Sequence, residues 1–437
     1  MKILLLGHCS YYTISNFTKA IKENYADVQV SVADPVKPGN GKLSAEEKRI
    51  FDEILILPQK RKIILNRKDK NKSLFEILKN KSKRKEILRS IFSLRYKSVI
   101  NQINSNAEER KYSIEMKELL KNYDIYHYHY LAPEYLTTQK YLPEGKKVLM
   151  TFWGSDLFQI SGVENYKTQF EALNKSDLIT VNTIEVKETA LSKFGRNLDT
   201  KMRFADFGLN KVRLELIESR NKEEANSEFR KKYNIPPDKI IITIGYSGSS
   251  KQRHIEILKI LNKLDKRIRD KIYAVLPLTY GLQFEEKNYL QRIQDECEKV
   301  NFGSLIISEF MPQNELIDFI ISSEIKLNLR DTDAMNAAML ESLFAGNIVI
   351  NGAWLPYGKL RRFEIYYREI EKLSEIENEI TYIADNLENE KNKTSGNSDL
   401  IKKYFLYENI FSDWKNIYDE LYKSPNKKIN VTENIKV

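Results

Sequence analysis

The segment RDTDAMNAAMLESLFAGNIVI, residues 330–350, combines carboxylates, small side chains and a glycine. Asp333 and Glu341 stand eight positions apart, a spacing that predicts two carboxylates on one face of a helix. We expect a residue of 331–333 to cap this helix and Gly346 to end it. A positive helix N-terminus between two acids suits a nucleotide sugar, which carries both phosphates and hydroxyls. The alternative is an N-cap Asp with an exposed Glu.

Residues around the start of this helix complete the predicted anion site. Arg330 follows the buried run IKLNLR and supplies a full positive charge. Small residues in the first turn let a ligand approach the backbone N–H groups. The residues predicted to contact the donor here are Arg330, Asp333, Met335, Asn336, Ala337 and Glu341.

A second small-residue turn, IGYSGSSKQRH at 244–254, follows another strand-like run. Amides on such a turn, with a helix start behind them and two cations beside them, predict a diphosphate site. The spacing GxxxxGK[ST] of a P-loop is absent. The predicted contacts are Gly245, Ser247, Gly248, Lys251 and Arg253.

Three histidines and one turn stand at the ends of strand-like runs in the first half. His8 follows KILLLG, and His127 and His129 lie in YHYHYL. No Asp, Glu or Cys beside the two neighbouring histidines completes a metal set, so we predict no metal site. The turn TFWGSDLF places Trp153 and Asp156 around a glycine, as a sugar contact or as a plain helix cap.

Short apolar runs alternate with helical patterns along the whole chain. Runs separated by 15 to 30 residues predict two parallel sheets covered on both faces, hence two doubly wound Rossmann-like α/β domains that face a central cleft. The predicted strands are 2–7, 28–34, 53–58, 124–131, 147–154 and 178–183 in the first half, and 240–247, 272–280, 304–310, 325–330 and 347–352 in the second.

The charged stretch that ends in Pro-Pro marks the predicted connection between the two halves. We expect an N-terminal acceptor-binding domain at 1–207, a linker at 208–238 and a nucleotide-sugar domain at 239–396. Helices at 397–423 are predicted to return to the N-terminal domain, and 424–437 to be disordered. Ligands of such sheets bind beyond the carboxyl ends of the strands, where the residues above stand.

The cysteine content, the apolar runs and the charge of the chain limit the class of protein to which it can belong. Two cysteines far apart exclude a disulfide framework and suit a cytoplasmic chain, and no apolar run is long enough to span a bilayer. The net charge is +10, yet residues 60–97 alone hold 15 Lys or Arg against three acids, a surplus of +12. This segment is interpreted as a solvated helix pair with a core-facing stripe or as a surface for anionic lipid. Nucleic acid is disfavoured, because few aromatic residues accompany the charge.

Four motifs resemble those of the GT-B glycosyltransferases, in particular the retaining group that uses nucleotide-diphosphate sugars. DAMNAAMLE before LFAGNIVI is similar to the two glutamates of that group that have seven residues between them, with Asp333 in the first place. GYSGSSK is similar to its G-R-x-x-x-x-K turn, with Tyr246 in place of the arginine. DIYHYH and WGSD resemble its D-x-x-H-x-H and H-G-x-D segments.

The resemblance implies roles for the matching residues. Glu341 would hold the ribose and Asp333 the donor sugar, while Lys251 with Arg253 or Arg330 would clamp the diphosphate. His129 would orient the donor sugar, and the acceptor would meet His127 and Trp153. In an inverting enzyme Asp156 or His8 would be the base.

The expected activity is therefore a metal-independent, retaining hexosyl transfer from a nucleotide sugar to a lipid-linked saccharide, polysaccharide or other glycoconjugate. No cofactor is expected besides this co-substrate. The chain would be cytoplasmic, with residues 60–97 holding it to the inner face of a membrane. A nucleotide-sugar epimerase and a non-catalytic GT-B-like binding or scaffold protein are the alternatives.

Overall fold

The computed structural model describes residues 1–7, 12–36, 45–93 and 96–424 of the chain. These residues form two compact units. The first unit comprises 1–152, 161–180 and the chain from 415 onward, and the second comprises 153–160 and 181–414. His8 and most of the predicted tail, 425–437, lie outside the described residues.

The first sheet has the strand order β3-β2-β1-β4-β5-β6-β7, and the pairings from β3 to β6 are parallel. Its central strands β1, β2, β4 and β5 are buried on both faces over almost their whole length, as crossover helices require. The strands are β1 (Lys2–Leu6), β2 (Gln29–Ala33), β3 (Glu53–Leu55), β4 (Ile125–His129), β5 (Lys147–Thr151), β6 (Leu178–Val181) and β7 (Met202–Phe204).

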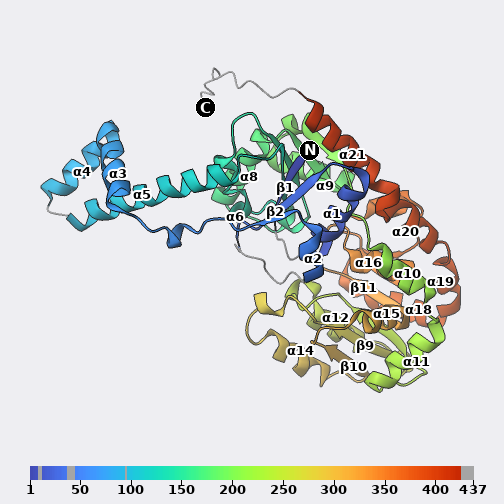
Figure 1. The fold of residues 1–437 in the computed structure, drawn as a ribbon. Helices are drawn as coiled ribbons and strands as arrows, with labels where there is room; N and C mark the ends of the chain where they lie inside the picture. The colour runs from blue at the N-terminus through green and yellow to red at the C-terminus, as the bar shows by residue number, and fades with distance from the viewer. Residues whose placement is uncertain (8–11, 37–44, 94–95, 425–437) are drawn as a thin grey trace. The chain divides into compact units, whose positions relative to one another are not determined.

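The helices of the first half connect these strands, and three of them form a separate group (Figure 1). In that group α3 (Arg67–Lys79) and α4 (Lys81–Phe92) pack on the long α5 (Tyr96–Leu119). The remaining helices are α1 (Tyr12–Asn24), α2 (Ala45–Ile50), α6 (Pro133–Leu136), α7 (Ser155–Phe158), α8 (Val163–Lys175) and α9 (Ile184–Phe194).

The second sheet has the order β10-β9-β8-β11-β12-β13, and all of its pairings are parallel. Numbered along the chain, this is the 3-2-1-4-5-6 order of a doubly wound sheet, with its reversal between β8 and β11. The strands are β8 (Ile240–Ile244), β9 (Ile272–Pro277), β10 (Gly303–Ile307), β11 (Ile325–Asn328), β12 (Ile348–Gly352) and β13 (Arg368–Ile370).

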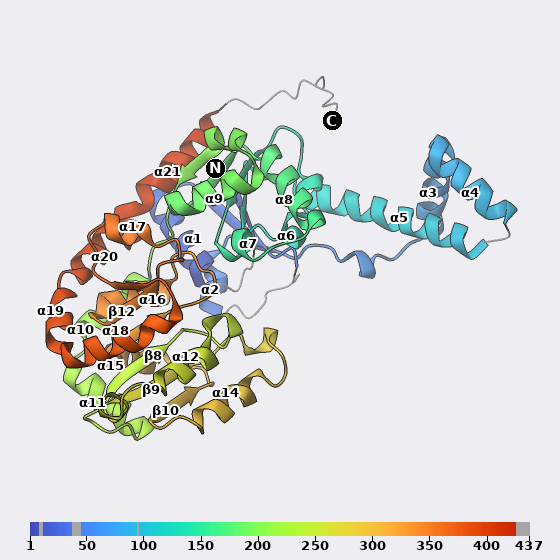
Figure 2. The same ribbon diagram turned by 180° about the vertical axis from the view of Figure 1, so that it is seen from behind.

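Helices cover both faces of this sheet (Figure 1 and Figure 2). One face packs against α12 (His254–Leu261), α14 (Tyr289–Cys297) and α18 (Ile376–Asp385). The other face packs against α10 (Lys211–Ser219), α11 (Lys222–Tyr233), α15 (Gln313–Ser322), α16 (Ala337–Ala345) and α20 (Asn397–Phe405). The other helices of this half are α13 (Lys266–Arg269), α17 (Gly358–Arg362), α19 (Leu387–Lys393) and α21 (Tyr407–Lys423).

The predicted fold class of two doubly wound α/β units is confirmed, and each predicted strand is present near its expected place. β7 and β13 were not predicted, because both are three-residue strands without a continuous apolar run. Residues 208–238, interpreted above as a linker, mostly form α10 and α11, which pack within the second unit. No helix among the described residues combines the length and apolarity needed to cross a bilayer.

Candidate functional site

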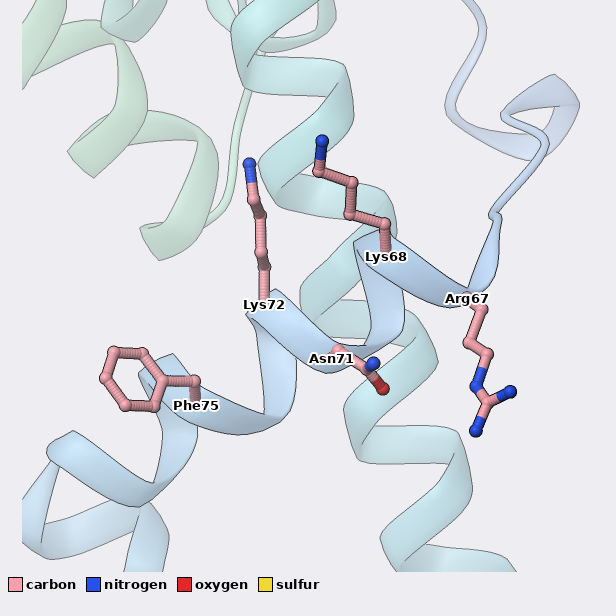
Figure 3. A pocket seen from close by; sticks show the side chains of 5 residues that line it. All are labelled: Arg67, Lys68, Asn71, Lys72 and Phe75. Carbon is pink, nitrogen blue, oxygen red and sulfur yellow. The ribbon is translucent and has the colours of Figure 1, made fainter.

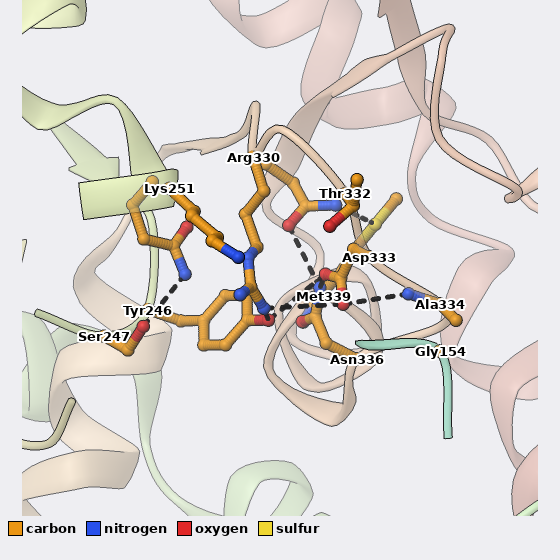
Figure 4. Close-up of polar contacts among 12 residues, drawn as sticks. Gly154, Tyr246, Ser247, Lys251, Arg330, Thr332, Asp333, Ala334, Asn336 and Met339 are labelled. Atoms are coloured by element: carbon orange, nitrogen blue, oxygen red, sulfur yellow. Dashed lines mark hydrogen bonds and ion pairs between the residues drawn. The ribbon is translucent and has the colours of Figure 1, made fainter. Parts of the chain in front are cut away.

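The candidate site lies at the reversal of strand order in the second sheet. The loops after β8 and β11 leave the carboxyl ends of adjacent strands, where a doubly wound sheet opens a crevice for ligands. Tyr246 follows β8 and Arg330 follows β11. Their side chains meet, so the two loops form one polar site (Figure 4).

Arg330 is held by an aromatic residue and a carboxylate. Its Nη1 donates to the hydroxyl of Tyr246, and its guanidinium carbon lies 5.3 Å from the centre of that ring. The same Nη1 is 3.7 Å from Oδ1 of Asp333. Burial opposes the charge, but Tyr246 and Asp333 outweigh it, and the pKa of Arg330 is raised. Within the described part of the chain, no group accepts a hydrogen bond from its buried Nε.

Asp333 is the centre of this network. Its Oδ2 accepts from Nδ2 of Asn336 at 2.6 Å, from the Tyr357 hydroxyl at 3.0 Å and from the Tyr246 hydroxyl at 3.2 Å. Its Oδ1 accepts from the amide of Ala334 at 2.9 Å. A nearly buried carboxylate is tolerated only with such partners, so its position is fixed before any ligand arrives.

The helix after this loop starts later than the sequence predicted. Asn336 is the N-cap, and its Oδ1 accepts from the amide of Met339 at 2.7 Å. Because α16 begins at Ala337, Asp333 lies in the preceding loop and not on one helix face with Glu341. That prediction was wrong, because an Asn three positions further along offered the better cap. Met335 has a positive φ of 54° in this loop, and Gly346 ends the helix as predicted.

A chain of hydrogen-bonded asparagine side chains, here called the ladder, holds the N-cap residue Asn336 in place. Nδ2 of Asn336 also donates to Oδ1 of Asn328 at 3.0 Å, and Nδ2 of Asn328 donates to Oδ1 of Asn351 at 2.8 Å. Asn328 and Asn351 are paired residues at the ends of β11 and β12, and both are fully buried. Each amide satisfies the next, so the ladder fixes the orientation of the Asn336 side chain.

The loop after β8 is shaped by close approaches of its backbone. Gly245 has a φ of 68°, and a Cβ there would lie 2.8 Å from Oε1 of Gln252. A Cβ at Gly248 would lie 2.5 Å from Cγ of Leu282. The hydroxyl of Ser247 is buried and accepts from Nε2 of Gln252 at 3.0 Å. These glycines therefore permit a turn that no larger residue fits.

The two predicted cations of this loop have different partners. Nζ of Lys251 donates to Oε1 of Gln159 at 2.6 Å, whose Nε2 donates to the hydroxyl of Thr332 at 2.8 Å. Arg253 instead forms an ion pair with Asp331. The charge of Arg253 is therefore offset by Asp331, whereas the ammonium group of Lys251 donates to a neutral amide.

Glu341 is separate from the Asp333 network. It is buried on α16, and its Oε1 accepts from Nη1 of Arg213 on α10 at 2.8 Å. Burial raises the pKa of Glu341, and Arg213 and Lys326 oppose that effect. Burial lowers the pKa of Lys326 to about 8, partly offset by Glu341, and its Nζ donates to the carbonyl of Gly245 at 3.2 Å. Glu341, the acid predicted to bind ribose, is thus paired with Arg213 in the interior next to the loop after β8.

The histidines predicted to act in the first unit lie in its core. Nδ1 of His127 is 2.7 Å from the hydroxyl of Tyr418 and its Nε2 is 2.6 Å from that of Thr151. His127 therefore offers no surface to an acceptor, contrary to the prediction. His129 is fully buried with its ring centre 3.8 Å from that of His127, and burial lowers its pKa to about 3. His129 is therefore neutral, so it could contact the donor sugar only as an uncharged imidazole and not as a cation.

Asp156 shapes the turn on which it lies. It is fully buried, and its Oδ1 accepts from the amides of Trp153 at 3.0 Å and Gly154 at 2.8 Å. Gly154, and not Asp156, is the N-cap of α7, so this acid holds the turn before the helix instead of capping it. Gly154 has a φ of 111°, and a Cβ there would lie 2.4 Å from Cβ of Ala334. The turn therefore lies directly against the Asp333 loop, and the partly buried Trp153 packs against Phe207 with the ring planes tilted by 56°.

Several residues of the site were missed from the sequence. Asn328 and Asn351 interrupt otherwise apolar strands, a signal that sequence reasoning could have used. Tyr357 and Gln159 carry no such signal, because both lie in loops or short helices far along the chain from their partners. Within the described residues, no group of three or more His, Cys, Asp or Glu side chains could hold a metal ion.

Comparison with solved structures identifies the architecture. Anabaena HepE in complex with UDP superposes with a TM-score of 0.67 at 12% identity, covering 96% of this chain and 100% of that one. The GT-B architecture joins two such doubly wound units in one chain. The chain has the GT-B glycosyltransferase fold.

Two further GT-B structures match over almost the whole chain. Sucrose-phosphate synthase from Thermosynechococcus elongatus has a TM-score of 0.66 at 12% identity, covering 97% of this chain and 99% of that one. WaaG, a glycosyltransferase involved in lipopolysaccharide biosynthesis, has a TM-score of 0.61 at 12% identity, covering 97% and 100%. No protein-family model matches the sequence, and no curated protein matches it. The likeness is one of fold.

Proposed function

We propose that this chain is a glycosyltransferase that moves a sugar from a nucleoside-diphosphate sugar to a saccharide or lipid-linked acceptor. The donor would bind in the second unit, beyond the carboxyl ends of β8 and β11. The observation that carries the proposal is Arg330, a cation fixed by Tyr246 and Asp333 at the reversal of strand order between β8 and β11. HepE, which shares the fold, was solved with UDP and with UDP-glucose.

The cations of the site suit the chemistry of the leaving group. In the transfer, the bond between the anomeric carbon and the diphosphate breaks, and its electron pair leaves on the diphosphate. The acceptor oxygen forms the new bond, and its proton ends on the released diphosphate or in water. Arg330 and Lys251 would stabilise the departing charge, each donor contributing on the order of 3 kcal/mol. We therefore propose a transfer that does not need a metal ion.

Asp333 and the start of α16 would contact the transferred sugar. The carboxylate is already oriented by four donors, and further sugar hydroxyls could bond to its Oδ1. Glu341 would act differently from the sequence prediction, by fixing Lys326 and the Gly245 backbone under the nucleotide. Retention at the anomeric carbon and hexosyl transfer remain part of the proposal on the motif resemblance. A cytoplasmic, membrane-associated location remains part of it because of the two distant cysteines and the basic segment 60–97.

A thermal-shift screen of nucleoside diphosphates tests the proposal. We expect UDP or another nucleoside diphosphate to raise the melting temperature of the wild type, and Lys251→Ala to reduce that shift. Lys259→Ala, an exposed lysine on α12, is the matched control and should keep the wild-type shift. Turnover of the matching nucleotide sugar with an acceptor would then separate a transferase from an epimerase. No shift with any nucleotide would favour the scaffold alternative and refute the proposal.

A further inference from the structure

The group formed by α3, α4 and α5 has a very small core. Ser73, Ile77 and Ile87 are the fully buried side chains described on α3 and α4. The hydroxyl of Ser73 donates to the carbonyl of Ile103 on α5 at 2.8 Å, which attaches α3 to that helix. The apolar stripe predicted from the sequence therefore contributes only Ile77 to this core among its described side chains.

Five further apolar residues with described side chains on α3 and α4 are exposed. Phe92 is 86% exposed and Phe75 is 59% exposed, although large apolar side chains on a solvated helix are normally buried or few. Leu74, Leu78 and Leu88 are exposed as well. A helix pair that only meets water would not need these residues, so the solvated-pair interpretation does not explain them.

Cations surround these exposed apolar residues. Lys68 and Lys72 extend side by side from one face of α3, and Phe75 follows them along the helix (Figure 3). With Arg67 and Asn71 they line an open hollow of about 530 Å³. Throughout the described portions of α3 and α4, no Lys or Arg side chain forms an ion pair. Their charge is therefore available to an anionic partner.

We propose that the outer surface of α3 and α4, the α3–α4 surface, docks the protein on a bilayer that contains anionic lipids. The aromatic and leucine side chains would enter the interface between headgroups and acyl chains. The lysine and arginine stems would extend beside them, with their charges on the lipid phosphates. Lys68, Lys72 and Phe75 place two cations and a ring around one hollow, a size and chemistry that fit a phosphate headgroup.

Charge and apolarity together favour lipid over nucleic acid. Three leucines accompany two phenylalanines among the exposed apolar residues of α3 and α4, and leucine offers no platform for stacking bases. A bilayer uses both kinds of side chain, because apolar burial there does not depend on ring geometry. The inference does not depend on the donor site, since α3 and α4 belong to the first unit.

Vesicle co-sedimentation of the full chain tests the inference. We expect binding to vesicles of phosphatidylcholine with 30% phosphatidylglycerol, weaker binding at high salt, and at least tenfold weaker binding to pure phosphatidylcholine. Lys68→Gln with Lys72→Gln should weaken binding about 25-fold, since each charge contributes about fivefold. Lys259→Gln with Lys263→Gln, two exposed lysines of the second unit, should bind like the wild type.

Insertion of the rings is measured separately. The emission of Phe92→Trp should shift to the blue on anionic vesicles and be quenched by brominated lipid, after subtraction of the wild-type spectrum. Phe310→Trp, at a residue 85% exposed in the second unit, should show neither change. Equal binding to neutral and anionic vesicles, unchanged binding of the lysine variant, or binding of single-stranded RNA without vesicles would overturn the inference. Nucleotide-induced thermal shifts should be the same in these variants, so this failure is distinct from failure of the proposed function.

Discussion

Replacing Tyr246 by Phe removes the hydroxyl that joins Arg330 to Asp333 and keeps the ring. Asp333 would still accept from Asn336 at 2.6 Å, from Tyr357 at 3.0 Å and from the amide of Ala334 at 2.9 Å. The loss therefore falls on Arg330, which keeps only the ring contact and Asp333 at 3.7 Å.

A hydrogen bond to a charged group contributes about 1.5–3 kcal/mol, so Tyr246→Phe should destabilise the fold by about 2 kcal/mol. If Arg330 binds the diphosphate, the loss of the hydrogen bond that orients Arg330 should also weaken binding of a nucleoside diphosphate about tenfold, equivalent to ~1.4 kcal/mol. Chemical denaturation measures the first effect and isothermal titration calorimetry the second.

Tyr357→Phe is the matched control. It removes another hydroxyl from Oδ2 of Asp333 and leaves the contacts of Arg330 with Tyr246 and Asp333 in place, so it should lower stability with little loss of nucleotide affinity. The reasoning is refuted if Tyr246→Phe and Tyr357→Phe weaken nucleotide binding equally, or if neither weakens it while both destabilise the fold.

Three further predictions concern the surroundings of the site. Glu341→Ala should lower the free energy of unfolding by about 2 kcal/mol, because it removes a hydrogen bond between a buried carboxylate and the partly buried Arg213; unchanged denaturation would contradict this. Because the pKa of Lys326 is lowered to about 8 in the folded state, the unfolded chain binds more protons than the folded one between pH 8 and the ordinary pKa of lysine. The contribution of Lys326 to the free energy of unfolding therefore rises with pH in that range. Denaturation curves of Lys326→Met should lack this rise. Gly154→Ala should destabilise by about 1–3 kcal/mol, whereas Gly396→Ala, which meets nothing within 4 Å, should be near neutral.

Much of the architecture could be predicted because buried parallel strands are continuous apolar runs. Strands such as Ile240–Ile244 and Lys2–Leu6 therefore stand out in the sequence, and their alternation with helices indicates a doubly wound sheet. β13 was missed because its three residues, Arg-Glu-Ile, hold no apolar run, whereas the equally short β3 lies in the apolar run EILILP. The place of β13 is set by its pairing with β12.

The site could be predicted only where it follows a strand directly. Arg330 and the glycine turn at 245–248 leave strand ends, and the strand order brings them together. The shared helix face of Asp333 and Glu341 failed because the spacing of two residues does not reveal where a helix starts. Several residues of this loop could have capped the helix, and Asn336 is the one that does so. Its side chain is held by a hydrogen bond to Asn328, a tertiary contact that the local sequence does not reveal.

The most direct measurement compares the affinities for UDP and for uridine in the wild type and in Arg330→Gln. If Arg330 contacts the diphosphate, the wild type should prefer UDP strongly, and the variant should lose most of that preference while its affinity for uridine stays the same. Equal UDP preference in both proteins, measured by calorimetry on folded samples, would contradict the account.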